Sequence, residues 1–130
     1  MSRKKRVILP YECIMYLSTE GDIFKAGYRE VKQEKYIREY ATAHGITIAG
    51  SMHRDALGMR DVDEHFLRMA KLIAAKRVQG VIVANMNTVS RDMIDAYRKV
   101  GLINMAGGVI ISVDEGLLKL NLKEKNHEEI

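Results

Sequence analysis

The chain has 130 residues, of which 47% are apolar and 29% are charged, and its formal net charge is +4. This length suits one domain, and the apolar fraction is sufficient for a buried core. One cysteine cannot form an internal disulfide, so the composition excludes a disulfide-stabilised secreted fold. No segment approaches the roughly 20 apolar residues of a membrane span, and none resembles the apolar core of a signal peptide. We therefore expect a cytoplasmic globular protein.

The net charge alone does not establish nucleic-acid binding, although four of the 21 cationic residues are adjacent at positions 3–6. Such a cluster contacts phosphates in some proteins and forms a solvated arm in others. Both interpretations stay open. We assign residues 1–10 to a basic N-terminal arm, residues 11–116 to the folded domain and residues 117–130 to a short charged tail.

Short apolar runs alternate along the chain with segments of helical periodicity. The first run contains Cys13, which we expect to be a buried, unreactive thiol. Gly45 and Gly101 are expected to end helices, and Ser90 is expected to cap the start of one. The expected strands are 12–18, 46–50, 81–84 and 109–113, and 117–122 is expected to be a short extra strand or a docked segment. The expected helices are 28–44, Asp63 to Ala74 and Ser90 to Val100. The second has an apolar stripe of Phe66, Met69, Ala70 and Ile73, and the third has Met93, Ile94 and Tyr97 at helical spacing.

This alternation predicts an α/β fold, a three-layer sandwich around a mostly parallel sheet of four to five strands. In the common doubly wound order, the first strand lies between the second and the third. The carboxyl ends of the first and third strands then meet at one edge of the sheet. Ser18 and Thr19 follow the first strand, so we expect them near Asn87, Thr88 and Arg91, which follow the third.

A serine hydroxyl and an arginine at this edge favour a phosphate-binding site, because the planar guanidinium matches phosphate oxygens. A Ser-His-Asp triad needs a histidine near Ser18, and none of His44, His53, His65 and His127 is expected there. We predict no metal and no cofactor, because neither metal-ligand spacings nor glycine-rich nucleotide motifs occur. A receiver-type phosphorylation site is excluded as well, because asparagines stand where it needs an aspartate. On these residues alone, a strand-end hydroxyl and a solvated arginine remain the simpler interpretation.

Five segments, taken in order, resemble the catalytic domain of the serine recombinases, the resolvase and invertase family. They are Y-L-S-T at 16–19, K-Q-E-K-Y-I-R-E-Y-A-T-A-H-G-I-T-I at 32–48, R-D-A-L-G-M-R at 54–60, F-L-R-M at 66–69 and Q-G-V-I-V-A-N-M-N-T-V-S-R-D at 79–92. The family shows Y-x-R-x-S-T for the first segment and V-x-x-L-D-R-L-S-R-D for the last. The motifs are short, but together they keep the order and spacing of the family.

The resemblance implies a resolvase-like fold and a DNA substrate. In this family a serine attacks a DNA phosphodiester, forms a 5′-phosphoserine link and later rejoins an exchanged strand, while arginines neutralise the phosphate. By position, Ser18 would be the nucleophile and Arg91 a retained arginine of the central motif. Asn87, Thr88 and Arg60 would be further candidates for contacts to DNA phosphate. The implied partners are DNA and either copies of this chain or a partner recombinase, as in a mobile element.

The sequence departs from the family pattern at several of these positions. Tyr16 stands where the first strand of the family has arginine, and Asn87 and Thr88 replace the aspartate and arginine of the central motif. An asparagine cannot exchange a proton as a carboxylate does. Each lost phosphate contact costs about 2–4 kcal/mol at the transition state. We therefore predict that strand cleavage is impaired or absent. The stretch after Val113 is also expected to be too short for a dimerisation helix and a DNA-binding domain.

Two other functions fit the same residues. One is a non-enzymatic oligomerisation or regulatory module that keeps the resolvase fold. The other is a small α/β protein that binds a phosphorylated ligand at the same edge of the sheet.

Overall fold

The structure is a computed structural model of the chain, and it describes residues 11–18, 23–54 and 61–118. Within these ranges the strands are β1 (Glu12–Leu17), β2 (Thr47–His53), β3 (Gly80–Val83), β4 (Val109–Ser112) and β5 (Gly116–Leu118). The helices in the same ranges are α1 (Ile23–His44), α2 (Asp61–Ala74), α3 (Met86–Val89) and α4 (Met93–Met105).

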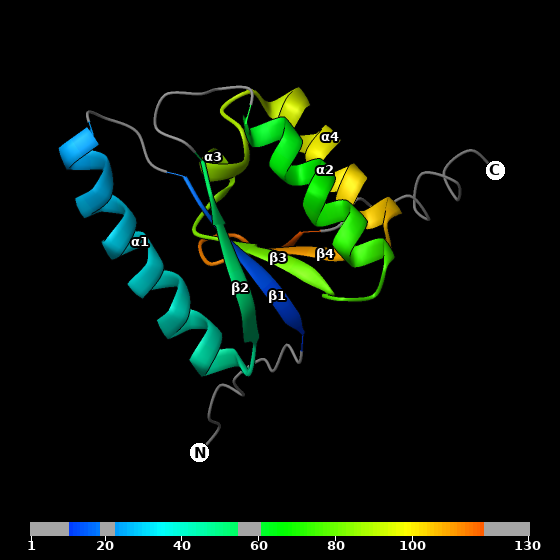
Figure 1. Cartoon of the computed structure of the whole chain (residues 1–130), viewed down its shortest axis with the longest axis horizontal. Coiled ribbons are helices and arrows are strands. Elements are labelled where there is room, and N and C mark those ends of the chain that lie inside the picture. Colours follow the sequence, from blue (N-terminus) through cyan, green and yellow to red (C-terminus); the bar gives the residue numbers. More distant parts are fainter. Residues whose placement is uncertain (1–10, 19–22, 55–60, 119–130) are drawn as a thin grey trace, which may run out of the picture.

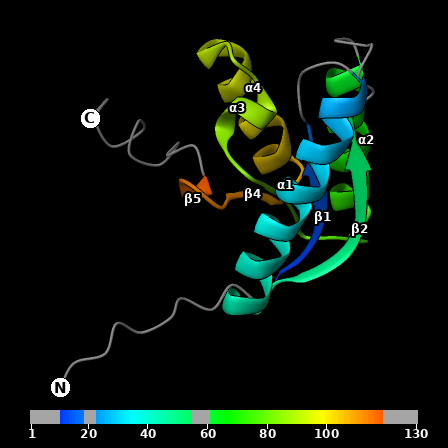
Figure 2. The same cartoon turned by 90° about the vertical axis from the view of Figure 1, so that its left-hand side faces the viewer.

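These strands form one sheet in the order β2-β1-β3-β4-β5. Strands β1 to β4 pair in parallel, and β5 pairs antiparallel with β4. Helix α1 packs on one face of the sheet, and α2 and α4 pack on the other (Figure 1). Turned by 90°, the sheet shows β5 and β2 at its two ends (Figure 2). The predicted α/β sandwich with a mostly parallel sheet is confirmed, including the place of β1 between β2 and β3.

Strand β1 is buried on both faces, which is typical of a central strand in a parallel sheet. Its residues alternate between two cores. Ile14 and Tyr16 pack with α2 and α4, whereas Cys13, Met15 and Leu17 pack with α1. The strand therefore contributes side chains to the core on each face of the sheet.

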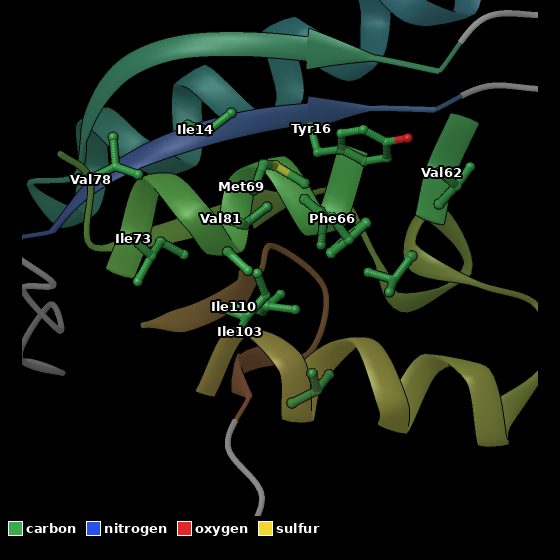
Figure 3. Packing of buried hydrophobic residues seen from close by; sticks show 14 residues of the cluster. Ile14, Tyr16, Val62, Phe66, Met69, Ile73, Val78, Val81, Ile103 and Ile110 are labelled. Atoms are coloured by element: carbon green, nitrogen blue, oxygen red, sulfur yellow. The ribbon is translucent and has the colours of Figure 1, made fainter. Parts of the chain in front are cut away.

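The core between the sheet and α2 uses the stripe that was predicted from the sequence. Phe66, Met69 and Ile73 of α2 are all buried. In Figure 3, Phe66 and Met69 lie beside Tyr16 of β1, and Ile73 lies farther along α2, near Val78. Full burial of such a side chain contributes about 1.5–3 kcal/mol, so this core fixes α2 on the sheet.

Three predicted boundaries are corrected by the structure. Helix α1 begins at Ile23, before Gly27, because a long helix tolerates the cost of about 1 kcal/mol for one interior glycine. Helix α2 begins at Asp61 rather than after Asp63. Strand β2 continues beyond residue 50 to His53, held by pairing with β1 at the end of the sheet. Its side chains are mostly exposed there, so no apolar run marks its full length.

Helix α4 differs from the prediction in its length and in its buried face. It passes through Gly101 to Met105, and Gly107, with φ 98°, follows its end. The side chains of Met93, Ile94 and Tyr97 are 73%, 71% and 59% exposed. The helix instead turns Ala96, Lys99, Val100 and Ile103 inward.

Cys13 is expected to resist thiol reagents in the folded protein. Its side chain is fully buried, and burial raises the pKa of the thiol to about 12. At pH 8 only about one thiol in ten thousand is then ionised, and the thiolate is the reactive form. A colorimetric thiol reagent should react within seconds in denaturant and no faster than unfolding in native buffer. Prompt reaction in native buffer would contradict this burial.

Candidate functional site

A cavity of about 830 Å³ lies at the carboxyl edge of the sheet. It is lined by residues of α1, α2 and α4, by the residues directly after β1 and β2, and by the stretch between β3 and α4. Ser18, Asn87, Thr88 and Arg91 are all among its lining residues. The structure therefore brings these four predicted site residues together. Arg60 and Thr19 lie outside the described residues.

Gln33 of α1 holds the backbone of Ser18 in place. The Ser18 N–H donates to Gln33 Oε1 at 2.8 Å, and Gln33 Nε2 donates to the Ser18 carbonyl oxygen at 3.2 Å. This two-point contact fixes the residue directly after β1 against α1. Gln33 lies within the expected helix 28–44, but its contact with Ser18 joins residues 15 positions apart and was not predicted.

The stretch after β3 contains the short helix α3, which was not predicted from the sequence. Asn85 caps this helix, and its Oδ1 accepts from the N–H and the hydroxyl of Thr88, both at 3.2 Å. Ser90 was predicted to cap the next helix, and this prediction is wrong. Ser90 ends α3, and its Oγ accepts from the Asp92 N–H at 3.1 Å. Asp92 caps α4 instead, by accepting from the Ile94 N–H.

Thr88 and Asn87, the two candidate phosphate contacts of the central motif, differ in their surroundings. Thr88 is buried, and its hydroxyl donates to Asn85. Asn87 is exposed at the cavity. Glu115 supports this stretch from the β4–β5 turn, because its Oε1 accepts from the Met86 N–H at 3.1 Å.

The cavity also contains cations that the sequence analysis did not assign to it. They are Arg29 of α1, Arg54 after β2, and Arg98 and Lys99 of α4. Together with Arg91 they make five cationic side chains among the described lining residues, and the acidic side chains in the same set are Asp63, Asp92 and Asp95. These cations come from distant parts of the chain, and only the fold shows that they share one cavity.

Lys99 links α2 to α4 beside this cavity. Its side chain is 6% exposed, and its Nζ lies 2.8 Å from Asp63 Oδ1 and donates to Asp95. The hydrogen bond from Lys99 holds the pKa of Asp95 below its usual range, and a hydrogen bond from Ser90 acts in the same direction. A buried ammonium is stable only with such partners, so this cation serves the packing of two helices.

Tyr16, which stands where the resemblance implies an arginine, belongs to the core. Its side chain is fully buried and its hydroxyl lies 3.1 Å from His65 Nδ1. Its ring meets Phe66 edge-on, with 5.2 Å between ring centroids. Tyr16 is not among the side chains that line the cavity.

A second hollow lies on the outer surface of α1 and contains none of the predicted site residues. It is lined by Val31, Glu34, Lys35, Arg38, Glu39, Thr42 and Ala43. Among the described residues, no group of three or more histidine, cysteine or acidic side chains is placed to hold a metal ion. No helix in the described part of the chain has the length and apolar character needed to cross a membrane.

No protein-family model matches the sequence, and no curated protein does. Solved structures do match the fold. The chain is similar to the C-terminal catalytic domain of ISC1926 TnpA, an IS607-like serine recombinase, with 18% identity and a TM-score of 0.64 over 91% of this chain and 76% of that chain. It is similar to a resolvase family site-specific recombinase from Streptococcus pneumoniae, with 20% identity and a TM-score of 0.68 over 81% and 73%.

A third similar structure is the N-terminal catalytic domain of TP901-1 integrase, with 18% identity, a TM-score of 0.65 and coverage of 81% of this chain and 78% of that chain. Two of these structures are catalytic domains, of a serine recombinase and of an integrase, and the third is a resolvase family recombinase. At these identities the likeness concerns the fold. The chain therefore has the fold of resolvase-type serine-recombinase catalytic domains.

Proposed function

We propose that this chain is a recombinase-type domain that binds a DNA phosphodiester at the cavity around Ser18 and is impaired in strand cleavage. The observation that carries the proposal is the anchored Ser18 in a cavity whose lining, among the described residues, includes five cationic and three acidic side chains. An excess of cations around a serine whose backbone is fixed suits the binding of a phosphate group. The resolvase-like fold makes DNA the expected source of that phosphate.

Impaired cleavage follows from the surroundings of Ser18. Attack by a serine needs a group that accepts its proton and charges that stabilise the phosphate in the transition state. Tyr16 is committed to the core, Asn87 carries no carboxylate, and the Thr88 hydroxyl donates to Asn85. Each missing donor costs about 10²–10³ in rate, so the chain is expected to bind DNA without forming a lasting 5′-phosphoserine link.

The test combines binding and cleavage. A short fluorescent DNA duplex is titrated with the wild type, with Ser18→Asp and with Thr42→Asp. Ser18→Asp places a negative charge in the cavity and should weaken binding by about tenfold or more, as the loss of a charge-assisted contact does. Thr42→Asp adds the same charge in the hollow on the outer surface of α1, so it should change affinity by less than about twofold.

In parallel, supercoiled DNA that spans the gene for this chain is incubated with the wild type and with Ser18→Ala. We expect no protein–DNA adduct that survives detergent. An adduct that disappears in Ser18→Ala would show active cleavage and overturn the proposed impairment. Equal binding by the wild type and Ser18→Asp would overturn the proposed DNA site.

A non-enzymatic oligomerisation module is a second candidate, favoured by the exposed Met93, Ile94 and Tyr97 on α4. Exposed apolar groups that lie together are typical of interaction surfaces. This candidate predicts that DNA affinity is low and indifferent to Ser18→Asp, and that the chain self-associates on sedimentation.

A further inference from the structure

The turn between β4 and β5, residues 113–115, is fixed to the central part of the sheet. The N–H of Val113 donates to the Val83 carbonyl oxygen at 2.9 Å, and the N–H of Asp114 donates to the Ala84 carbonyl oxygen at 3.1 Å. These bonds continue the β3–β4 pairing past the end of β3. The turn therefore has a fixed place at the carboxyl edge of the sheet, next to the residues that lead from β3 into α3.

Glu115 connects this turn to α3. Its Oε1 accepts from the N–H of Met86 at 3.1 Å, and it also accepts from the hydroxyl of Ser112. The Oγ of Ser112 in turn accepts from the Glu115 N–H at 3.1 Å. The first N–H groups of a helix have no acceptor within the helix, so Glu115 fixes the start of α3. This short helix brings Asn87 and Thr88 to the cavity.

Asp114 connects the same turn to α1. Its Oδ1 accepts from the hydroxyl of Tyr36. Tyr36 stands three residues after Gln33, and residues three apart are neighbours on the surface of a helix. Gln33 holds the backbone of Ser18 with two hydrogen bonds. The bond between Asp114 and Tyr36 therefore helps to fix the part of α1 that anchors Ser18.

The part of α1 that contains Gln33 has no buried side chain between residues 28 and 36. Among the described side chains of α1, those buried in the core are Ile37 and Ala41, which pack on the sheet. Gln33 lies one turn before this packed part of the helix. The bond from Tyr36 to the turn therefore limits the movement of Gln33 relative to the sheet.

We infer that Asp114 and Glu115 are positioning residues, which set the separation between Ser18 and α3 and thereby the fit of a DNA phosphate in the cavity. This inference rests on the proposed DNA function and adds residues that act on its site from outside. Neither carboxylate is among the lining residues of the cavity. Asp114 acts through α1 and Glu115 acts through α3. One turn thus holds two walls of the same cavity.

The first test separates positioning from charge. Glu115→Ala and Glu115→Gln remove the same negative charge, but only Glu115→Gln keeps an oxygen that can accept from the N–H of Met86. Electrostatics alone predicts equal DNA affinity for the two variants. Positioning predicts that Glu115→Ala binds a short fluorescent duplex about three- to tenfold more weakly than Glu115→Gln, the range for one lost hydrogen bond. Asp114→Ala and Asp114→Asn form the matching pair for the contact with Tyr36.

A merely structural role of Glu115 would not depend on Ser18. Ser18→Asp is expected to weaken binding at the cavity, so in that background Glu115→Ala and Glu115→Gln should bind DNA alike, within about twofold. Thermal melting of every variant shows whether it is folded under the assay conditions. Equal affinities of Glu115→Ala and Glu115→Gln with Ser18 present, or a difference that persists with Ser18→Asp, would overturn the inference.

Amide hydrogen exchange tests the contact with α1 without DNA. Tyr36→Phe removes the hydroxyl that donates to Asp114, and the Ser18 N–H should then exchange at least about threefold faster than in the wild type. Tyr28→Phe is the matched control, because it removes a hydroxyl from another exposed tyrosine of α1 and should leave this exchange unchanged. Equal exchange in the wild type and Tyr36→Phe would overturn the inference. A wild type that shows no DNA binding weakened by Ser18→Asp would instead contradict the proposed function, and the exchange would still decide whether the turn positions Ser18.

Discussion

Replacing Tyr16 by arginine is expected to destabilise the protein strongly and to give no DNA cleavage. The change restores the residue type that the family resemblance implies at this position. In this chain, however, the side chain is fully buried and packs edge-on against Phe66, with its hydroxyl near His65. A guanidinium here loses its hydration without a counter-ion, which costs about 3–5 kcal/mol. For a domain of this size, the melting temperature should fall on the order of 10–20 °C.

The matched control is Tyr16→Phe, which keeps the ring and removes the hydroxyl. It should cost only about 1 kcal/mol, the net value of one hydrogen bond. Thermal and urea unfolding of both variants measure the difference, and the detergent-resistant adduct assay reports cleavage. A stable Tyr16→Arg variant would show that the guanidinium reaches the cavity, and a Ser18-dependent adduct in it would show that one arginine restores the chemistry.

This expectation depends on a distinction that the sequence alone does not make. The motif shows that Tyr16 departs from the family, but a tyrosine two residues before Ser18 is compatible with a place in the cavity or in the core. The side chain joins the core because the T-shaped contact with Phe66 and the hydrogen bond to His65 need residues of α2. These partners are about 50 positions away, and only the packing of α2 on the sheet reveals them.

The fold was predictable because its central strands are buried on both faces. Such strands appear as short apolar runs, and β1, β3 and β4 lie within a residue or two of the predicted ranges. Strand β2 lies at the end of the sheet with exposed side chains, so its second half gave no apolar signal. At the start of α4 the sequence does show an apolar pattern, but this pattern does not mark the buried face of the helix. Met93, Ile94 and Tyr97 have helical spacing, but the helix turns other residues toward the sheet.

Of the candidate site, only the residues that follow strands β1 and β3 could be predicted from the sequence. The doubly wound order brings Ser18 to the residues after β3, and this follows from topology. Arg29 and Gln33 reach the same cavity from α1, and Arg54 reaches it from the position after β2. Gln33 and Arg54 lie within segments that resemble the family, but the resemblance gave neither of them a role at the site. The catalytic role of Ser18 and Arg91 stays a prediction.

Removing both carboxylates that hold Lys99 should be the second strongly destabilising change. The variant Asp63→Asn/Asp95→Asn keeps the side-chain shapes and leaves a lysine that is 6% exposed without a counter-ion. We expect a loss of about 3 kcal/mol in the free energy of unfolding, the lower end for a broken buried pair, because Asp63 itself is exposed. Lys99→Met, added to this variant, removes the unpaired ammonium and should restore most of the loss. Urea unfolding measures the effect of Lys99→Met on the free energy of unfolding, in the wild type and in Asp63→Asn/Asp95→Asn. Equal effects in these two proteins would contradict the coupling between Lys99 and the two carboxylates.

The contact between Lys99 and Asp95 predicts how the stability of the fold depends on pH. The hydrogen bond from Lys99 lowers the pKa of Asp95 in the folded protein, below the value of about 3.9 in an unfolded chain. A carboxyl whose pKa is lowered by folding contributes its stabilisation above the unfolded pKa and loses it as the pH falls through the folded pKa. The stability difference between the wild type and Asp95→Asn should therefore be full at neutral pH and should shrink below about pH 4. A difference that stays constant down to acid pH would show that the negative charge of Asp95 does not hold α2 and α4 together.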